Sequence, residues 1–152
     1  MRFGGLDMEV AVATEATEEL ASAFARLIPQ LSATAVPPDR KALAEIIAAP
    51  CNTVLIARHE GKIVGTLTLV VFRIPTAVRA WIEDVVVDSQ ARGRGAGEAL
   101  TAEAMRIARE RGARTIDLTS RRSREAARKL YEKAGFAVRD TTVFRYAVPE
   151  KR

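Results

Sequence analysis

The sequence contains few cysteine, histidine and aromatic residues, and each shortage excludes a class of protein. A single cysteine, Cys51, excludes an internal disulfide. Together with the one histidine, His59, it forms a poor ligand set, so we expect no metal site. Aromatic residues make up only 5% of the chain, too few for the base-stacking surfaces of nucleic-acid-binding domains. We therefore expect a metal-free protein that has no nucleic-acid partner.

Long apolar runs are also missing. The longest has only a handful of residues, whereas a membrane-spanning helix needs about 20, so we expect no membrane partner. Residues 1–7 lack the basic region and apolar run of a secretory signal, which indicates a cytoplasmic protein. A length of 152 residues, with 48% hydrophobic and 28% charged residues, fits a single domain over residues 1–152.

The net charge of +5 is concentrated in the second half of the chain. Residues 1–76 contain 7 Lys or Arg and 8 Asp or Glu, whereas residues 77–152 contain 17 and 11. A basic half can meet nucleic acid, an acidic protein or a polyphosphate ligand. Arginine supplies 19 of the 24 basic residues. A codon bias toward arginine on solvated helix faces is therefore the alternative explanation for part of this positive charge.

Hydrophobic periodicity predicts a mixed α/β fold. Thr17 and Asp39 stand where capping residues would start two helices, and Gly61 marks a hairpin turn between two β-branched runs. The expected strands are residues 8–13, 53–58, 62–72, 79–87, 114–119, 136–138 and 143–148; the expected helices follow Thr17 and Asp39, cover 96–111 and end at Gly135. A helix between strands 79–87 and 114–119 predicts that these two are parallel within a mostly antiparallel sheet that has helices on both faces.

A loop rich in glycine and arginine, residues 90–97, lies where a strand gives way to a helix. Its alternating glycines are Gly93, Gly95 and Gly97, and its arginines are Arg92 and Arg94. Glycines let the backbone approach a ligand closely, and a helix start offers unpaired N–H groups and a positive dipole end. The loop therefore suits phosphate oxygens.

Two familiar phosphate-binding motifs do not fit this loop. The nucleotide P-loop needs Gly-Lys followed by Ser or Thr, and no such run is present. The dinucleotide fingerprint would need glycine at Glu98 or Leu100.

Two motifs resemble a known family. After a strand of three valines the loop contains Arg92-x-x-Gly95-x-Gly97, which resembles the Q/R-x-x-G-x-G/A hallmark of GCN5-related N-acetyltransferases. Residues 127–136 resemble the A-x-x-L-Y-x-x-x-G-F run of the same family, and the likeness covers about residues 53–148. A plain tight turn is the alternative explanation of the glycines, and the second motif argues against it.

The resemblance implies that acetyl-CoA is the acetyl donor. In that family the loop holds the pyrophosphate, and the preceding strand hydrogen-bonds the pantetheine arm within a splay between parallel strands 79–87 and 114–119. The residues this assigns to the cofactor are Val85, Val86, Val87, Arg92, Gly93, Arg94, Gly95, Ala96 and Gly97. An N–H group of Val85 is the expected donor to the oxyanion.

One position departs from the family pattern. Many members carry Asn seven residues before the motif tyrosine, where it contacts the pantetheine arm, and this chain has Arg124 there. Arg124 is therefore a candidate cofactor contact of a different kind. A solvent-facing helix arginine is the alternative.

The motif tyrosine, Tyr131, is the candidate general acid. By the resemblance it lies beside the cofactor sulfur, where a phenol can donate a proton to the departing thiolate. Core packing is the alternative, since its neighbours Ala127 and Leu130 are apolar.

Glu83 is the candidate general base, because a carboxylate in the apolar strand 79–87 needs a reason. Strict alternation would place Glu83, Val85 and Val87 on one face of the sheet and Asp84 on the other. Asp84 and water are the alternative bases. The structural alternative for Glu83 is an exposed edge position or a partner for Arg79.

Together these features predict an N-acetyltransferase that transfers the acetyl group to a primary amine of a small molecule or protein by direct attack in a ternary complex. A catalytically silent acyl-CoA-binding sensor on the same fold is the competing hypothesis. Homodimer formation is left open, and no motif in residues 17–50 or 73–78 identifies the acceptor.

Overall fold

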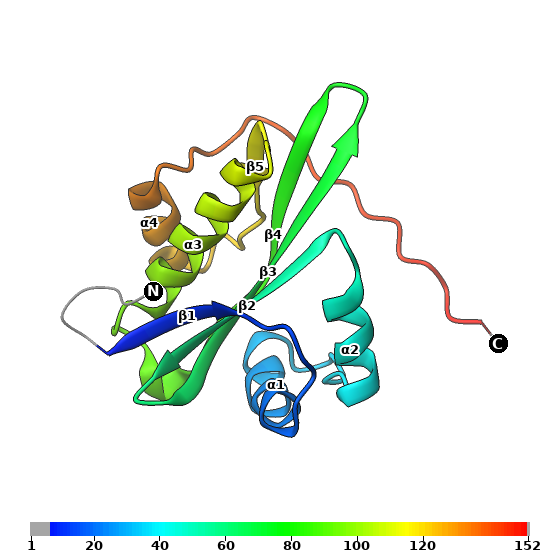
Figure 1. Ribbon diagram of the computed structural model, residues 1–152. Helices are drawn as coiled ribbons and strands as arrows, with labels where there is room; N and C mark the ends of the chain where they lie inside the picture. The colour runs from blue at the N-terminus through cyan, green and yellow to red at the C-terminus, as the bar shows by residue number, and fades with distance from the viewer. Residues whose placement is uncertain (1–6, 152) are drawn as a thin grey trace.

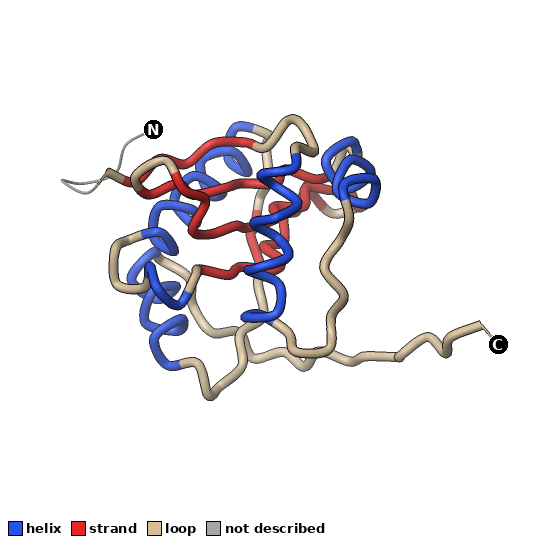
Figure 2. The backbone as a smooth tube through the Cα atoms, turned by 90° about the horizontal axis from the view of Figure 1, so that it is seen from below, coloured by secondary structure: helices blue, strands red, loops and turns tan. Residues whose placement is uncertain are grey.

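The computed structural model describes residues 7–151 and shows a twisted sheet with helices on both faces (Figures 1 and 2). The strands are β1 (Met8–Val12), β2 (Asn52–His59), β3 (Lys62–Ile74), β4 (Ala77–Val87) and β5 (Thr115–Asp117); the helices are α1 (Glu18–Leu31), α2 (Arg40–Ala48), α3 (Ala96–Glu110) and α4 (Glu125–Ala134), with a short 3-10 turn η1 (Ser89–Ala91). The strand order is β1-β2-β3-β4-β5, antiparallel except for the parallel pair β4–β5. The predicted fold class is confirmed. None of the helices in the described part of the chain is long and apolar enough to cross a bilayer.

The predicted start signals of the first two helices are confirmed. The Thr17 hydroxyl accepts a hydrogen bond from the Leu20 N–H at 3.1 Å, and the Asp39 carboxylate accepts one from Ala42 at 2.8 Å. Each side chain satisfies a backbone donor that has no partner within its helix. These caps fix where α1 and α2 begin, on one face of the sheet.

Two apolar layers hold the helices against the sheet. On the face covered by α1 and α2, Leu27 and Leu43 are fully buried against Val54 and Ile56 of β2. On the opposite face, Leu100 of α3 is fully buried in a second cluster that includes Leu67 of β3. Helices thereby cover both faces of the sheet, so a ligand can reach the sheet only at its edges and at the ends of its strands.

The parallel strands β4 and β5 pair over only three positions. Arg79 faces Thr115 and Trp81 faces Asp117, and β5 ends at that point. β4 continues to Val87 with no β5 residue beside it, so the two strands part after Trp81. The predicted splay is confirmed, and along it this edge of β4 has no strand partner among the described residues.

A β-bulge in β4 changes which residues share a face. The pairing with β3 shifts between Thr66 and Thr68, and Asp84 takes a left-handed conformation at φ 49°. Glu83 lies opposite Thr68 on the face covered by α1 and α2, whereas Val85 and Val87 pack toward the core beneath α3. The expectation of one shared face was therefore wrong, because an extra residue reverses the alternation.

The predicted strands 136–138 and 143–148 are absent. Residues 137–151, here called the C-terminal arm, form no helix or strand, and the end of the arm extends away from the body of the molecule (Figures 1 and 2). Phe136 still packs at the edge of the core, but the sheet ends at β5. No strand within residues 7–151 lies beside the strand-like sequence of the arm.

Candidate active site

The glycine-rich loop ends in an open helix N-terminus. Gly95 caps α3 with φ 85°, a left-handed conformation that strains any residue with a β-carbon. The first backbone hydrogen bond of the helix runs from the Ala99 N–H to the Gly95 carbonyl, at 3.0 Å. The amides of residues 96–98 therefore lie ahead of the helical hydrogen-bond ladder, at the positive end of the dipole. This arrangement fits the oxygens of a phosphate group.

Gly97 serves helix packing. A β-carbon at this position would lie 2.8 Å from a methyl carbon of Leu130, so the end of the Leu130 side chain would have to shift. Removing that carbon lets α4 approach the first turn of α3. Leu130 immediately precedes Tyr131, so this contact brings the helix of the candidate acid to the helix start of the loop.

The two loop arginines differ in their surroundings. Arg92 is exposed, whereas the Arg94 guanidinium donates to Nε2 of His59 at 2.8 Å. Because arginine is only a donor, His59 accepts at Nε2 and can donate from Nδ1 to the Asp7 carbonyl, 3.1 Å away. Arg94 is thus held beside the β2–β3 hairpin, while Arg92 is free to meet a ligand.

Tyr131 is half-buried on α4 and lies edge-on to Phe136, with 5.9 Å between the ring centroids. Burial raises the pKa of its phenol, and the positive charge of Arg124 partly offsets that rise. The phenol therefore stays protonated at neutral pH, as a proton donor must be. Besides packing against Phe136, Tyr131 lines the cavity described below.

Arg124 is exposed at the N-terminal end of α4 and accepts the first backbone bond of that helix from Arg128, at 3.1 Å. Its positive charge lowers the pKa of the Tyr131 phenol and so opposes the effect of burial. Arg124 thus lies on the tyrosine side of the site, where a contact with a bound cofactor remains a prediction.

Glu83 and Asp84 are both exposed, and the structure gives neither carboxylate an ion pair with a described side chain. In particular, no ion pair joins Glu83 to Arg79. Glu83 precedes the bulge of β4, and Asp84 lies in it next to Val85. Both side chains are therefore accessible to solvent.

A cavity of about 1350 Å³ runs along β5 and α4. Its lining includes Trp81, Leu118, Arg128, Tyr131 and residues 136–139. The loop residues 92–97 and Glu83 lie outside this lining. The loop contacts α4 at Gly97, and Tyr131 of α4 lines the cavity. The candidate site residues do not all line this one cavity.

Comparison with known proteins identifies the family of the chain. The model of the acetyltransferase (GNAT) family matches residues 16–136, most of the chain. The chain belongs to this family. Its members are acetyltransferases, which makes the protein an N-acetyltransferase, as the sequence predicted.

Individual relatives agree. An uncharacterised N-acetyltransferase of Mycobacterium tuberculosis is 29% identical over 144 residues, covering 84% of this chain and 87% of the relative. A Trypanosoma brucei acetyltransferase structure has a TM-score of 0.75 at 29% identity, covering 93% of this chain and 100% of the other. An aminoglycoside acetyltransferase from an uncultured soil sample, solved with sisomicin, has a TM-score of 0.80 at 19% identity, covering 94% and 97%, and shares the fold.

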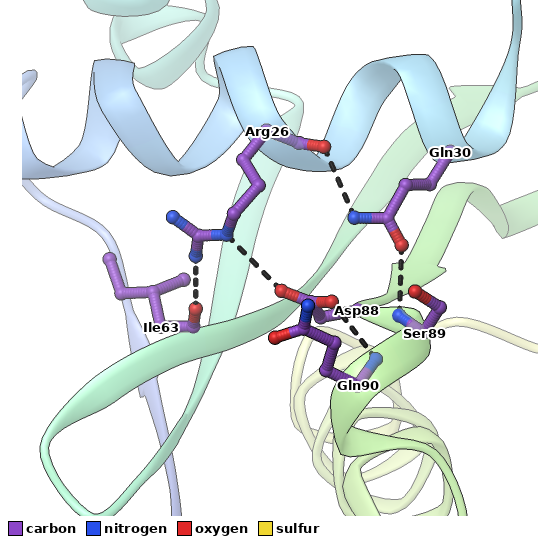
Figure 3. Close-up of polar contacts among 6 residues, drawn as sticks. All are labelled: Arg26, Gln30, Ile63, Asp88, Ser89 and Gln90. Atoms are coloured by element: carbon purple, nitrogen blue, oxygen red, sulfur yellow. Dashed lines mark hydrogen bonds and ion pairs between the residues drawn. The ribbon is translucent and has the colours of Figure 1, made fainter.

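The sequence analysis missed the network that anchors this acetyltransferase's loop. Asp88, which is buried, accepts hydrogen bonds from Arg26 of α1 at 3.2 Å and from the Gln90 N–H at 3.1 Å (Figure 3). Gln30 of α1 accepts another from the Ser89 N–H at 2.8 Å. The Gln90 amide and Arg26 hold the pKa of Asp88 below its usual range, although burial opposes them. An acidic residue between an apolar strand and a glycine-rich turn was the available signal.

Proposed function

We propose that this enzyme transfers an acetyl group from acetyl-CoA to a primary amine of a small molecule or a protein, by direct attack in a ternary complex. The observation that carries the proposal is the splay of β4 from β5 next to the open N-terminus of α3. The loop glycines and free amides fit a pyrophosphate group, and the unpaired edge of β4 fits an extended amide chain. Acetyl-CoA, when bound, supplies an activated acyl group as a thioester.

The loop residues from Arg92 to Gly97 would hold the pyrophosphate. The α3 amides supply hydrogen bonds, the left-handed glycines let the backbone approach closely, and Arg92 supplies charge. Val85, Val86 and Val87 would hydrogen-bond the pantetheine arm through the β4 edge that β5 leaves unpaired. Arg124 would contact the same arm from the start of α4.

Glu83 would act as the general base. A protonated primary amine has a pKa of about 10 and must lose a proton before it can attack. A carboxylate near the strand end would accept that proton. Glu83 is exposed, which suits transfer through an intervening water. Asp84, at the bulge, is the second candidate.

The Val85 N–H would stabilise the negative charge that develops on the acyl oxygen. The bulge at Asp84 supports this role, because a bulge interrupts the ladder and re-aims the backbone that follows. Tyr131 would donate its proton to the departing sulfur. Its raised pKa keeps that proton available at neutral pH.

The acceptor is best described as a primary amine. Two acidic residues of the N-terminal half are already ion-paired, Glu18 with Arg40 at 3.7 Å and Glu19 with Arg58. Their negative charge is therefore partly compensated within the chain. The aminoglycoside bound in one relative of the same fold makes antibiotics a rational part of a screen.

A screen of primary amines with acetyl-CoA, followed by release of the free thiol, tests this function. We expect thiol release that requires one class of amine and scales with enzyme. Binding of acetyl-CoA without amine-dependent release would contradict transfer and favour a silent acyl-CoA-binding domain. Failure of acetyl-CoA to bind would contradict the site itself.

A further inference from the structure

The side chain of Arg94 in the glycine-rich loop contacts the side chain of His59 at the end of β2. Nη1 of Arg94 lies 2.8 Å from Nε2 of His59, although 35 residues separate the two in the chain. Arg94 immediately precedes Gly95, which caps α3. An arginine side chain carries five N–H donors in a fixed planar fork, and this contact uses one of them. The β2–β3 hairpin thereby reaches the loop through a specific side-chain contact.

His59 is itself fixed by neighbours on both sides of β2. Its backbone pairs with Met8 of β1 and with Lys62 of β3, and its side chain is only 11% exposed. Nδ1 of the ring lies 3.1 Å from the Asp7 carbonyl oxygen. The ring therefore has a defined orientation, which sets the position of Nε2 relative to the loop.

The two contacts of the His59 ring require one arrangement of its protons. Arginine can only donate, so Nε2 must accept from Arg94 and Nδ1 must carry the ring proton. Nδ1 then donates to the Asp7 carbonyl, which can only accept. The Glu60 carboxylate lies 3.9 Å from Nε2, beyond hydrogen-bond distance, so it does not compete with Arg94 for this nitrogen. The ring is therefore an oriented acceptor for Arg94.

Such an anchor has a physical consequence for an exposed arginine in a binding loop. A free arginine side chain samples many rotamers, and a ligand that immobilises it loses affinity as a result. Arg94 is exposed, so its guanidinium is accessible at the start of α3 while one nitrogen is held on the hairpin. Because the side chain is ordered before an anion arrives, part of the entropic cost of binding is removed.

We propose that His59 is a positioning residue for the cofactor: it holds the Arg94 guanidinium beside the N-terminus of α3, where it meets the phosphate groups of acetyl-CoA. This inference rests on the proposed function, which assigns these phosphates to the loop. His59 acts through Arg94 rather than on the reacting atoms. The hairpin thereby contributes to cofactor affinity through one side chain of the loop.

Two other roles for the contact between His59 and Arg94 lead to different behaviour. If the contact only tethered the hairpin to the loop, its loss would lower stability and leave cofactor affinity unchanged. If the contact withheld Arg94 from the phosphates, its loss would strengthen binding. Positioning predicts weaker binding, and it predicts that the weakening requires Arg94. The exposure of the anchored guanidinium favours positioning.

The test uses two matched substitutions of His59 in the full-length protein. Asparagine places an amide near the position of Nδ1, so His59→Asn retains a donor to the Asp7 carbonyl but has no atom at the position of Nε2. Glutamine is one carbon longer, so the side-chain oxygen in His59→Gln reaches that position and accepts from Arg94. His59→Asn is also combined with Arg94→Met and, as the control, with Arg92→Met in the same loop. Calorimetry with acetyl-CoA and a thermal melt are recorded for each protein.

We expect His59→Asn to weaken acetyl-CoA binding about three- to tenfold and His59→Gln to bind about as tightly as the parent, all with similar melting temperatures. In the Arg94→Met background His59→Asn should cause no further loss, whereas in the Arg92→Met background it should cause the full loss. His59 is the only histidine of the chain, so nitrogen NMR of its ring can be read directly and should show the proton on Nδ1.

Equal affinity of His59→Asn and the parent for acetyl-CoA would overturn this proposal and leave the proposed function intact. Tighter binding by His59→Asn would overturn it too. So would a loss that glutamine does not restore, a loss that persists in the Arg94→Met background, or a ring proton on Nε2 in the free protein. A parent that does not bind acetyl-CoA would contradict the proposed function itself, and this proposal with it.

Discussion

Tyr131 combines burial with exposure to a cavity. Its ring packs against Phe136, yet its pKa is raised by the same burial that makes the phenol a stable proton donor. A residue that only filled the core would need neither the cavity nor the nearby charge of Arg124. The contrast between packing and proton donation can be measured.

The first prediction is that Tyr131→Phe lowers turnover strongly and leaves the melting temperature nearly unchanged. The substitution keeps the ring and its contact with Phe136 but deletes the donor. If the hydroxyl only packed, turnover would stay normal and at most about 1 kcal/mol of stability would be lost. Steady-state rates on an accepted amine, with a thermal melt of each protein, distinguish the two outcomes.

The second prediction concerns the base. Glu83→Gln should lower the rate at neutral pH by about 10²-fold or more, because the amine proton loses its acceptor, and should leave acetyl-CoA affinity nearly intact. Asp84→Asn is the matched control, since it removes a neighbouring exposed charge. A pH–rate profile that Glu83→Gln leaves unchanged would transfer the role to Asp84 or to water.

At the scale of elements, the loop and the start of α3 are positioned from two sides. Asp88, Arg26 and Gln30 attach the loop to α1, and Gly97 lets α4 pack against the first turn of α3. The loop is thus held by contacts far apart in the sequence. The proposed binding of phosphate by this loop would therefore depend on its backbone geometry as well as on its arginines.

The third prediction is that Gly95→Val weakens acetyl-CoA binding at least tenfold, about 1.4 kcal/mol. Valine is strained at φ 85° and would disturb the α3 amides that we propose as the phosphate site. Gly112→Val is the control, because Gly112 has φ 80° at the other end of the same helix. Calorimetry that shows equal affinity for Gly95→Val and the parent would rule out this placement.

The fourth prediction follows from the lowered pKa of Asp88. Folding lowers the pKa of the Asp88 carboxylate below its unfolded value, which is near 3.9. The carboxylate therefore stabilises the fold at any pH above the unfolded pKa, and this stabilisation is lost as the pH falls through the folded pKa. Asp88→Asn should lose on the order of 1 kcal/mol of unfolding free energy at pH 7, and the gap to the parent should narrow in acid.

Urea titrations at several pH values measure this gap. The control is Asp39→Asn, which removes a charge at an exposed helix cap where asparagine also caps well. A gap for Asp88→Asn that stays constant down to strongly acidic pH would show that the ion pair with Arg26 contributes nothing.

Local signals predicted most elements of this fold. The caps at Thr17 and Asp39, and the glycine that ends α4, were all readable from the sequence because each acts within one turn of its own helix. The bulge at Asp84 was not, because it is defined by the register of β4 against β3. The missed anchor, Asp88, depends on Arg26, which lies 62 residues away in the chain.

At the scale of the whole molecule, the C-terminal arm shows a second reason why prediction from sequence fails. Its alternating pattern predicted a strand over residues 143–148, and that prediction was wrong, because pairing needs a neighbouring strand and none lies beside this segment within residues 7–151. Periodicity identifies a capacity for pairing and leaves the identity of the neighbour open. The parallel pairing of β4 with β5 was predicted from the helix between them, whereas the family and the splay were predicted from the resemblance of two motifs.

The proposed reaction is transfer of the acetyl group by direct attack of the amine in a ternary complex. The only thiol, Cys51, precedes β2 and lies outside the cavity that Tyr131 lines, so the structure offers no nucleophilic cysteine beside that tyrosine. The most direct measurement is the initial rate with acetyl-CoA and an accepted amine varied together. Direct attack predicts double-reciprocal lines that intersect, because both substrates must be bound before transfer. Parallel lines, with acetyl found on the protein after incubation with acetyl-CoA alone, would contradict it.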